Sequence, residues 1–114
     1  MLKWRIGDVT VTKIVEMESV GGSRFILPQA TREAVAHLAW MKPHFMSDEG
    51  RLKMSVHALV IETPDRRIVV DTCIGNDKQG RAVPGWNGLQ GNFLKDLADA
   101  GYARESPNTA LCSW

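Results

Sequence analysis

The residues best placed for chemistry begin at Asp71, directly after the apolar run Ile68–Val70. Thr72 and Cys73 follow, and then Gly75 and Asn76 make a turn-forming segment. A carboxylate that follows a buried strand and precedes small residues is the usual way in which α/β proteins present polar groups at a functional edge. Asp residues also bond nearby backbone amides, so the alternative role of Asp71 is to cap the turn after it, and we expect this role in the chain.

Three further combinations of side chains have residue types suited to metal binding, nucleophilic catalysis or phosphate binding. Zinc sites usually contain closely spaced pairs of ligands, and the candidates lack such a pair, so no intrinsic zinc site is expected. We interpret His57 as a hydrogen-bonded strand histidine. The candidate ligands are His37, His44, His57, Asp71 and Cys73.

Cys73 could act as a nucleophile only with a nearby base and a lowered pKa, and no Cys-His-Asn signature is present. We therefore expect Cys73 and Cys112 to be buried free thiols rather than a disulfide. The segment Gly75–Gly80 has glycines but lacks the Gly-Lys-Ser/Thr ending of a phosphate-binding loop, which predicts a plain turn-rich loop.

Composition favours one small globular domain over residues 1–114, with 44% hydrophobic and 24% charged residues. The formal net charge is +1 and the charges are scattered, which predicts neither a nucleic-acid nor a membrane partner. The segment Met1–Arg5 lacks the apolar core of a signal peptide, and no stretch approaches the roughly 18 apolar residues of a membrane span. We expect a cytoplasmic protein.

The amino-terminal half alternates between strand patterns and irregular segments. Trp4–Glu16 alternates with period two around a Gly7-Asp8 turn, which predicts a β-hairpin. Met17–Arg24 reads as a flexible loop, and Phe25–Pro28 is expected to pack as a buried loop anchor. Arg32–Trp40, preceded by Thr31 as N-cap, is a predicted helix.

The residue pattern of the second half predicts a strand, a turn, a second strand, a long loop, a helix and a third strand. In order these are Leu52–Glu62, Thr63–Arg66, Ile68–Val70, Thr72–Gly88, Leu89–Ala100 and Thr109–Cys112. The last four form a βαβ unit, so the two strands should be parallel with their carboxyl ends at one edge. The continuous apolar run Ile68–Val70 predicts a strand covered on both faces.

Several blocks, in this order, resemble a known family. They are Trp4–Val9, Phe25–Pro28, His57–Thr63, Asp71–Lys78, Trp86 and Phe93–Gly101. Together they are similar to the amino-terminal part of metallo-β-lactamase-fold hydrolases, in the branch with lactonase-like and organophosphate-hydrolase-like members. The resemblance implies an α+β or α/β chain with a mixed β-sheet and two main helices, half of an αββα sandwich.

In that family the strand that resembles Ala110–Cys112 leads into a His-x-His-x-Asp-His motif, which holds one or two metal ions, commonly zinc. Complete members hydrolyse ester, lactone or phosphoester-type small molecules with a metal-activated water. Here Ser113 and Trp114 follow, and Trp114 occupies the place of the first metal-binding histidine. The resemblance places Asp71 near the metals. We take Asp71 and His57 as candidates that hydrogen-bond to metal ligands and orient them without binding the metal themselves.

We therefore expect a truncated amino-terminal half that has no metal ligands or cofactor of its own and is inactive alone. The alternative is a non-catalytic half-domain that forms a homodimer or pairs with a complementing carboxyl-terminal chain, because the faces of Met54–Val60 and Ile68–Val70 need cover. For four aromatic residues, the sequence does not decide between lining a substrate cleft and packing in the core or as loop anchors. They are Phe25, Trp40, Trp86 and Phe93.

Overall fold

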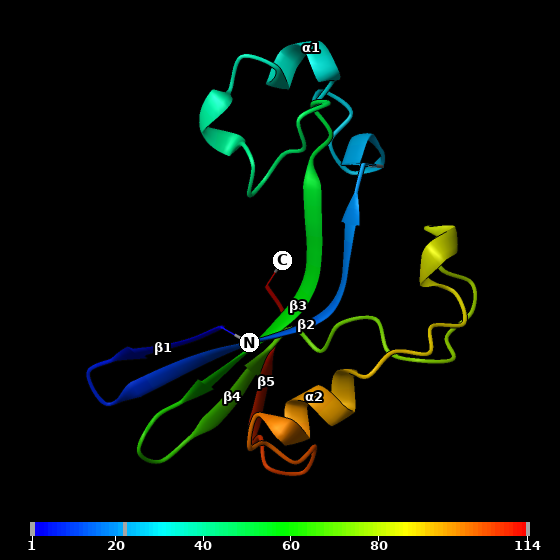
Figure 1. Ribbon diagram of the computed structural model, residues 1–114. Helices are drawn as coiled ribbons and strands as arrows, with labels where there is room; N and C mark the ends of the chain where they lie inside the picture. Colours follow the sequence, from blue (N-terminus) through cyan, green and yellow to red (C-terminus); the bar gives the residue numbers. More distant parts are fainter. Residues whose placement is uncertain (1, 22, 114) are drawn as a thin grey trace. The chain divides into compact units, whose positions relative to one another are not determined.

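The computed structural model describes residues 2–21 and 23–113. Its contacts divide the chain into two compact units, which we describe separately. The sheet unit comprises residues 1–17 and 56–114, and the excursion unit comprises residues 18–55 (Figure 1). That residues 1–114 form one incomplete domain stays a prediction.

The sheet has five strands in the order β1-β2-β3-β4-β5. Strands β1 and β2 are antiparallel, β3 and β4 are antiparallel, and β4 and β5 are parallel. The mixed α+β character predicted from the sequence is therefore confirmed. The strands are β1 Leu2–Ile6, β2 Val9–Val20, β3 Lys53–Glu62, β4 Arg67–Val70 and β5 Thr109–Leu111.

Both predicted hairpins form. Trp4 is opposite Val11, and Gly7 takes a φ of 61° in the connecting turn, a conformation that glycine adopts without strain. At the second turn, Thr63 N–H donates to the Arg66 carbonyl at 2.9 Å. The predicted loop at Met17–Arg24 is wrong in its first part, because β2 continues to Val20 beside β3 and its backbone groups find partners there.

The βαβ unit forms as predicted, with α2 spanning Phe93–Asp99 and Ile68 opposite Thr109 in the parallel ladder. The helix begins four residues later than predicted. Asn76 explains the delay, because its side chain accepts from Gly91 N–H at 2.9 Å and donates to the Gly91 carbonyl at 3.0 Å. These bonds hold the preceding segment outside the helix. Gly101 ends the helix with a φ of 99°, as predicted.

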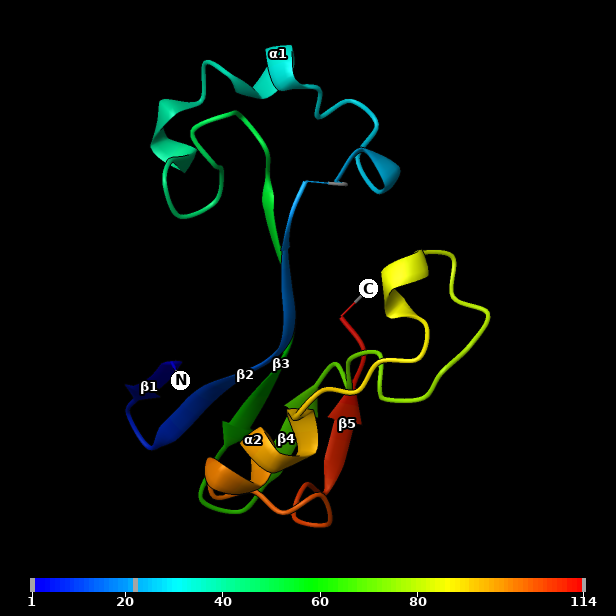
Figure 2. The same ribbon diagram turned by 45° about the vertical axis from the view of Figure 1, so that its right-hand side comes forward.

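Helix α2 packs on one face of the sheet, which we call the closed face (Figures 1 and 2). Leu97 of α2, 5% exposed, meets Val60 and Val69, which are 0% and 8% exposed. Contacts of this kind exclude water from apolar surface and supply most of the stability of a small unit. The core consists of Ile14, Ala58, Val60, Val69, Leu97 and Tyr102.

The opposite face of the same strands is also apolar. Strand alternation and register put Trp4 with Val11, Leu59 with Val70, and Ile61 with Ile68 on this side. We call it the open face. Its apolar members are Leu2, Trp4, Ile6, Val9, Val11, Val15, Leu59, Ile61, Ile68, Val70 and Leu111.

None of these open-face residues is buried, and Ile6 and Leu111 are 67% and 51% exposed. The prediction that Ile68–Val70 is covered on both faces is therefore wrong, since only Val69 is buried. The reason is that α2, the single α-helix among the described residues of the sheet unit, lies on the side to which Val69 points.

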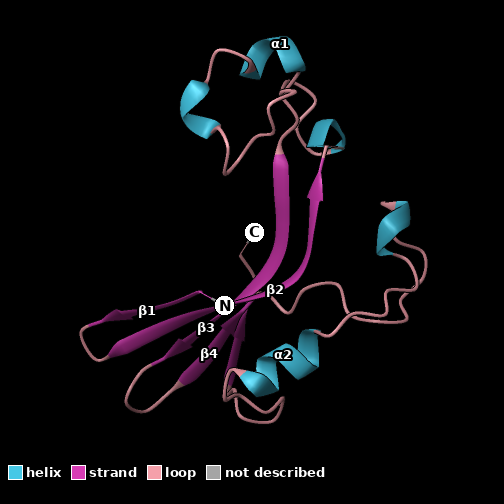
Figure 3. Cartoon of the chain, in the orientation of Figure 1, coloured by secondary structure: helices cyan, strands magenta, loops and turns pink. Residues whose placement is uncertain are grey.

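The excursion unit consists of short helical turns joined by irregular segments (Figure 3). Helix α1 spans only Arg32–Val35, and the Thr31 hydroxyl accepts from Ala34 N–H at 3.2 Å, so the predicted cap is confirmed. The predicted extension to Trp40 is wrong. Leu38 leaves helical geometry with a ψ of 67°, and so short a helix has little packing to sustain it.

Exposure of the Phe25–Leu27 segment contradicts its predicted role as a buried anchor. Phe25 is 66% exposed and Trp40 is 71% exposed. The reason is size, because Val35 and Met46 are the buried hydrophobic residues among those described in this unit. By contrast, Phe93 is partly buried against the core of the sheet unit. Among the residues that the structure describes, no helix has the length and apolarity required to cross a bilayer.

Candidate functional site

Asp71 lies at the carboxyl end of β4 and joins it to the end of β5. Its N–H donates to the Leu111 carbonyl at 2.8 Å, and its carboxylate accepts from Ser113 N–H at 2.8 Å and from the Ser113 hydroxyl. The predicted capping role is therefore corrected. The partner of the carboxylate is the segment after the neighbouring strand rather than the turn after Asp71.

The electrostatics of Asp71 follow from these bonds. The Ser113 hydroxyl, then the Ser113 N–H, and finally the charge of His57 hold the pKa of the Asp71 carboxyl below its ordinary value. The carboxylate is consequently ionised at neutral pH and serves as an acceptor, not as a proton donor. This is the protonation state that a group orienting a neighbouring donor requires.

His57 lies on β3, on the open face by strand alternation with Leu59 and Ile61. Burial lowers the pKa of its imidazole, Lys13 lowers it further, and the Asp71 carboxylate acts in the opposite direction. The structure therefore brings the two predicted site residues, His57 and Asp71, within electrostatic reach. Their role in orienting metal ligands stays a prediction.

The backbone after Asp71 alternates between ordinary and left-handed conformations. Asp71, Cys73 and Gly75 have φ values of 63°, 64° and 86°. For residues other than glycine this region costs roughly 1–3 kcal/mol each, and it persists only where surrounding contacts fix it. The segment is therefore strained and must be held by its neighbours.

Glu16 of β2 supplies that hold from the closed face. Its Oε2 accepts from Ile74 N–H and its Oε1 accepts from Gly75 N–H, both at 2.8 Å. This residue was not among the site residues predicted from the sequence. The available signal was its alternation with Thr12 and Ile14, which points an acidic side chain into an apolar face, where it needs donors.

Cys73 is an unsuitable nucleophile. Burial, followed by the charges of Glu16 and Asp71, raises the pKa of its thiol to about 12. The thiol is therefore protonated at neutral pH. Cys73 is a free thiol as predicted, but it is half-buried rather than fully buried. Cys112 is also a free thiol, but it is exposed, so its predicted burial is wrong. It follows the last paired residue of β5, a strand at the edge of the sheet.

Among residues 2–21 and 23–113, no three His, Cys, Asp or Glu side chains are grouped so that they could hold a metal ion. His37 and His44 belong to the excursion unit, whereas His57, Asp71 and Cys73 belong to the sheet unit. Trp114, which the resemblance placed at the first histidine of the metal motif, lies outside the described residues.

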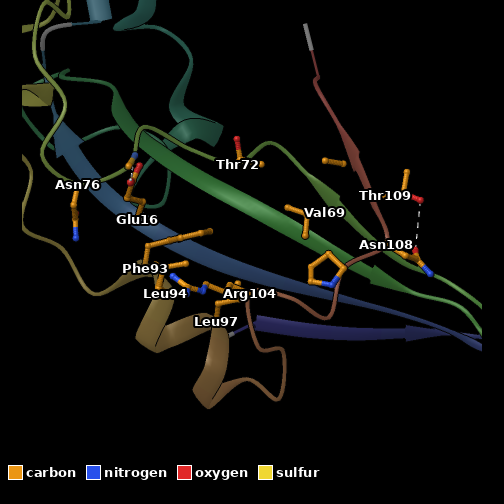
Figure 4. A pocket seen from close by; sticks show the side chains of 13 residues that line it. Glu16, Val69, Thr72, Asn76, Phe93, Leu94, Leu97, Arg104, Asn108 and Thr109 are labelled. Atoms are coloured by element: carbon orange, nitrogen blue, oxygen red, sulfur yellow. Dashed lines mark hydrogen bonds between the residues drawn. The ribbon is translucent and has the colours of Figure 1, made fainter.

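A cavity of about 510 Å³ lies between α2 and the β4–β5 edge on the closed side (Figure 4). Phe93 and Leu97 border it from the helix, Glu16 lines it from β2, and Asn76 lines it from the loop after β4. Neither Asp71 nor His57 lines it. The apolar cavity and the polar strand edge are therefore distinct features.

Comparison with known proteins gives a structural likeness. No family model matches the sequence, and no curated protein sequence is significantly similar to it. A probable metal-dependent hydrolase from Staphylococcus aureus is similar in structure, with a TM-score of 0.65 and 18% identity, over 96% of this chain and 38% of that chain.

Two further solved structures are similar. AidC, a dizinc quorum-quenching lactonase, has a TM-score of 0.64 and 17% identity, over 97% of this chain and 34% of AidC. The hydrolase AbOPH of the beta-lactamase superfamily has a TM-score of 0.60 and 18% identity, over 96% of this chain and 34% of AbOPH. The chain thus has the fold of part of these hydrolases and spans little more than a third of their length.

Proposed function

We propose that the chain is the amino-terminal supporting half of a metallo-β-lactamase-fold hydrolase and contributes the scaffold of a metal site rather than its ligands. One observation carries the proposal. The Asp71 carboxylate is ionised and fixed at the joined ends of two parallel strands, yet no three potential ligands are grouped among the described residues. Such a group can orient a ligand but cannot hold an ion alone.

The comparisons support the same proposal. The similar structures are metal-dependent hydrolases, one of them a dizinc lactonase, and this chain spans 34–38% of their lengths. In a complete enzyme, zinc would supply an activated water for hydrolysis of an ester, a lactone or a phosphoester. This chain would contribute Asp71 as an acceptor and the clamped segment that positions it, and the small-molecule substrate would be bound only by the complete enzyme.

The purified chain tests this division of labour. We expect less than stoichiometric zinc by elemental analysis after incubation with the metal and dialysis, and no turnover of lactone or phosphotriester substrates. Stoichiometric zinc together with turnover would show that the chain has its own active site and would overturn the proposal.

Genomic sequence offers an independent test. The nucleotides after the Trp114 codon can be translated in all three frames and searched for His-x-His-x-Asp-His. The motif in any frame, or in a neighbouring gene, would support a missing ligand-bearing half. A downstream sequence with no such motif in this gene or its neighbours would count against it.

The open face favours a second candidate, a non-catalytic half-domain that associates with a second copy or with a complementing chain. Large apolar residues of this face are partly or largely exposed, including Trp4 at 44% and Ile6 at 67%. Exposed apolar patches of this extent usually mark interaction surfaces. The face is a sheet with alternating apolar residues, which packs well against another sheet.

Sedimentation of the chain with matched variants distinguishes this candidate. Ile6→Lys puts a charge on the open face, whereas Leu94→Lys puts one on α2 at a residue that is 54% exposed. If the open face associates, Ile6→Lys should shift the chain to monomer and Leu94→Lys should not. A wild-type chain that is monomeric at high concentration would exclude self-association and leave only the complementing chain.

A further inference from the structure

Three arginine residues of the excursion unit line one small cavity. Arg24 follows β2, Arg32 begins α1, and Arg51 precedes β3. They converge although eight and nineteen residues separate them in sequence. The cavity measures about 250 Å³ and is completed by Val20, Gly21, Ala30, Gly50 and Leu52.

Two glycines allow the arginines to lie over the backbone. Gly21 has a φ of 85°, and a Cβ there would lie 3.7 Å from Arg51 Cδ and 4.0 Å from Arg51 Nη1. Gly50 has a φ of 80°, and a Cβ there would lie 3.3 Å from Arg32 Cγ. A side chain at either position would thus add bulk directly beside an arginine stem that lines the cavity.

The charges of the three arginines are not matched by ion pairs among the described residues. Among the described residues, no carboxylate lies within ion-pair distance of Arg24, Arg32 or Arg51. Glu49 is an acidic residue close enough for the charges of Arg51 and Arg32 to act on the pKa of its carboxyl. Its backbone hydrogen bond and its bond with Ser47 are the larger causes of its lowered pKa, so its carboxylate is engaged elsewhere. Three like charges around one cavity repel one another unless an anion joins them.

We propose that this cavity binds a phosphate group, either free or as the monoester of a small molecule. Guanidinium groups bind phosphate through paired, charge-assisted hydrogen bonds, and several arginines can engage different oxygens of one dianion. A carboxylate would offer only two oxygens and one charge. Val20, Ala30 and Leu52 give the cavity an apolar wall, against which a short carbon stem of a monoester would pack. The inference is independent of the proposed metallo-hydrolase scaffold.

Titration of the full chain with inorganic phosphate, followed by isotope-edited NMR, provides the test. We expect saturable shifts at the Gly21 and Gly50 amides, while amides of the sheet core remain unchanged. Arg32→Gln and Arg51→Gln should each weaken binding about tenfold, the effect of losing a charge-assisted hydrogen bond. Arg51→Lys keeps the charge and should recover only part of the affinity, because it cannot bind in a paired geometry.

Two control variants should not weaken phosphate binding: one should strengthen it and the other should leave it unchanged. Glu49→Gln removes the neighbouring negative charge and should tighten phosphate binding. Arg81→Gln removes an exposed arginine of the sheet unit and should change nothing. Spectra of each variant without phosphate verify folding. Binding unaffected by the arginine substitutions, or lost equally in Arg81→Gln, would overturn the proposal, as would the lack of any saturable shift.

A second arm identifies the source of the phosphate group. Co-sedimentation with phosphatidylcholine vesicles that contain phosphatidic acid is compared with binding of glycerol 3-phosphate. Arginine-dependent vesicle binding would assign a lipid headgroup, and arginine-dependent binding of the soluble monoester alone would assign a small molecule. If neither ligand binds in an arginine-dependent manner, the assignment to phosphate monoesters is wrong.

Discussion

The two faces of the sheet belong to the same strands but differ in cover. On the closed face, Ile14 and Val60 are 2% and 0% exposed beneath α2. On the open face, Trp4, Ile6 and Leu111 retain roughly half or more of their accessible surface. The difference shows that strand composition reports the demand for cover, whereas the rest of the fold decides which face receives it.

The strained segment after Asp71 lies at the junction of these faces. Glu16 holds it from the closed side through two amides. Asp71 connects it to β5, near His57 of the open side. A change on either face therefore reaches the same strand edge through different contacts.

The largest expected effect comes from making the same substitution, isoleucine to alanine, on each of the two faces. Ile14→Ala should lower the free energy of unfolding by about 2–5 kcal/mol, because it leaves a cavity in the core. Ile6→Ala, at a residue that is 67% exposed, should cost less than about 1 kcal/mol. Urea unfolding at low protein concentration measures both.

Equal losses for these two variants would contradict the distinction between a covered and an uncovered face. A loss for Ile6→Ala that grows with protein concentration would instead indicate that another molecule covers the open face.

The next effect concerns the clamp on the closed side. Glu16→Ala removes both acceptors of the Ile74 and Gly75 amides and should cost roughly 2–4 kcal/mol. It should also speed hydrogen exchange at these two amides. Glu18→Ala, at an exposed position of the same strand, is the matched control and should be nearly neutral. Unchanged exchange at Ile74 and Gly75 in Glu16→Ala would show that other contacts fix the segment.

The smallest effect is the titration of His57, which NMR can follow directly. Lys13→Gln should raise the pKa of His57 toward its ordinary value of 6.5, and Asp71→Asn should lower it further. The folded protein holds the pKa of His57 below that value. At a pH between the folded pKa and about 6.5, the unfolded chain therefore binds more protons than the folded protein. The contribution of His57 to stability is therefore present above about pH 6.5 and lost as the pH decreases through the folded pKa. Shifts of the same sign in both variants would contradict this arrangement.

Much of the sheet unit could be predicted from local pattern. Period-two alternation located the first hairpin. Gly7 marked the turn between β1 and β2, and Pro64 marked the turn between β3 and β4. Helix α2 was predicted four residues too long at its start, because the bonds from Asn76 to Gly91 join positions fifteen residues apart. The excursion unit was predicted least well, since its segments have too little core to impose regular structure.

The sequence by itself determined the strands, the βαβ connection and the resemblance to a metallo-hydrolase fold, because periodicity, turn residues and motif order are local properties of a chain. It also directed attention to Asp71 and His57. Only the tertiary structure decided that Ser113 is the partner of Asp71, that Glu16 clamps the strained segment, and that three arginines share one cavity. Those pairs are distant in sequence, and the folded backbone alone brings them within the few ångströms over which hydrogen bonds and charges act.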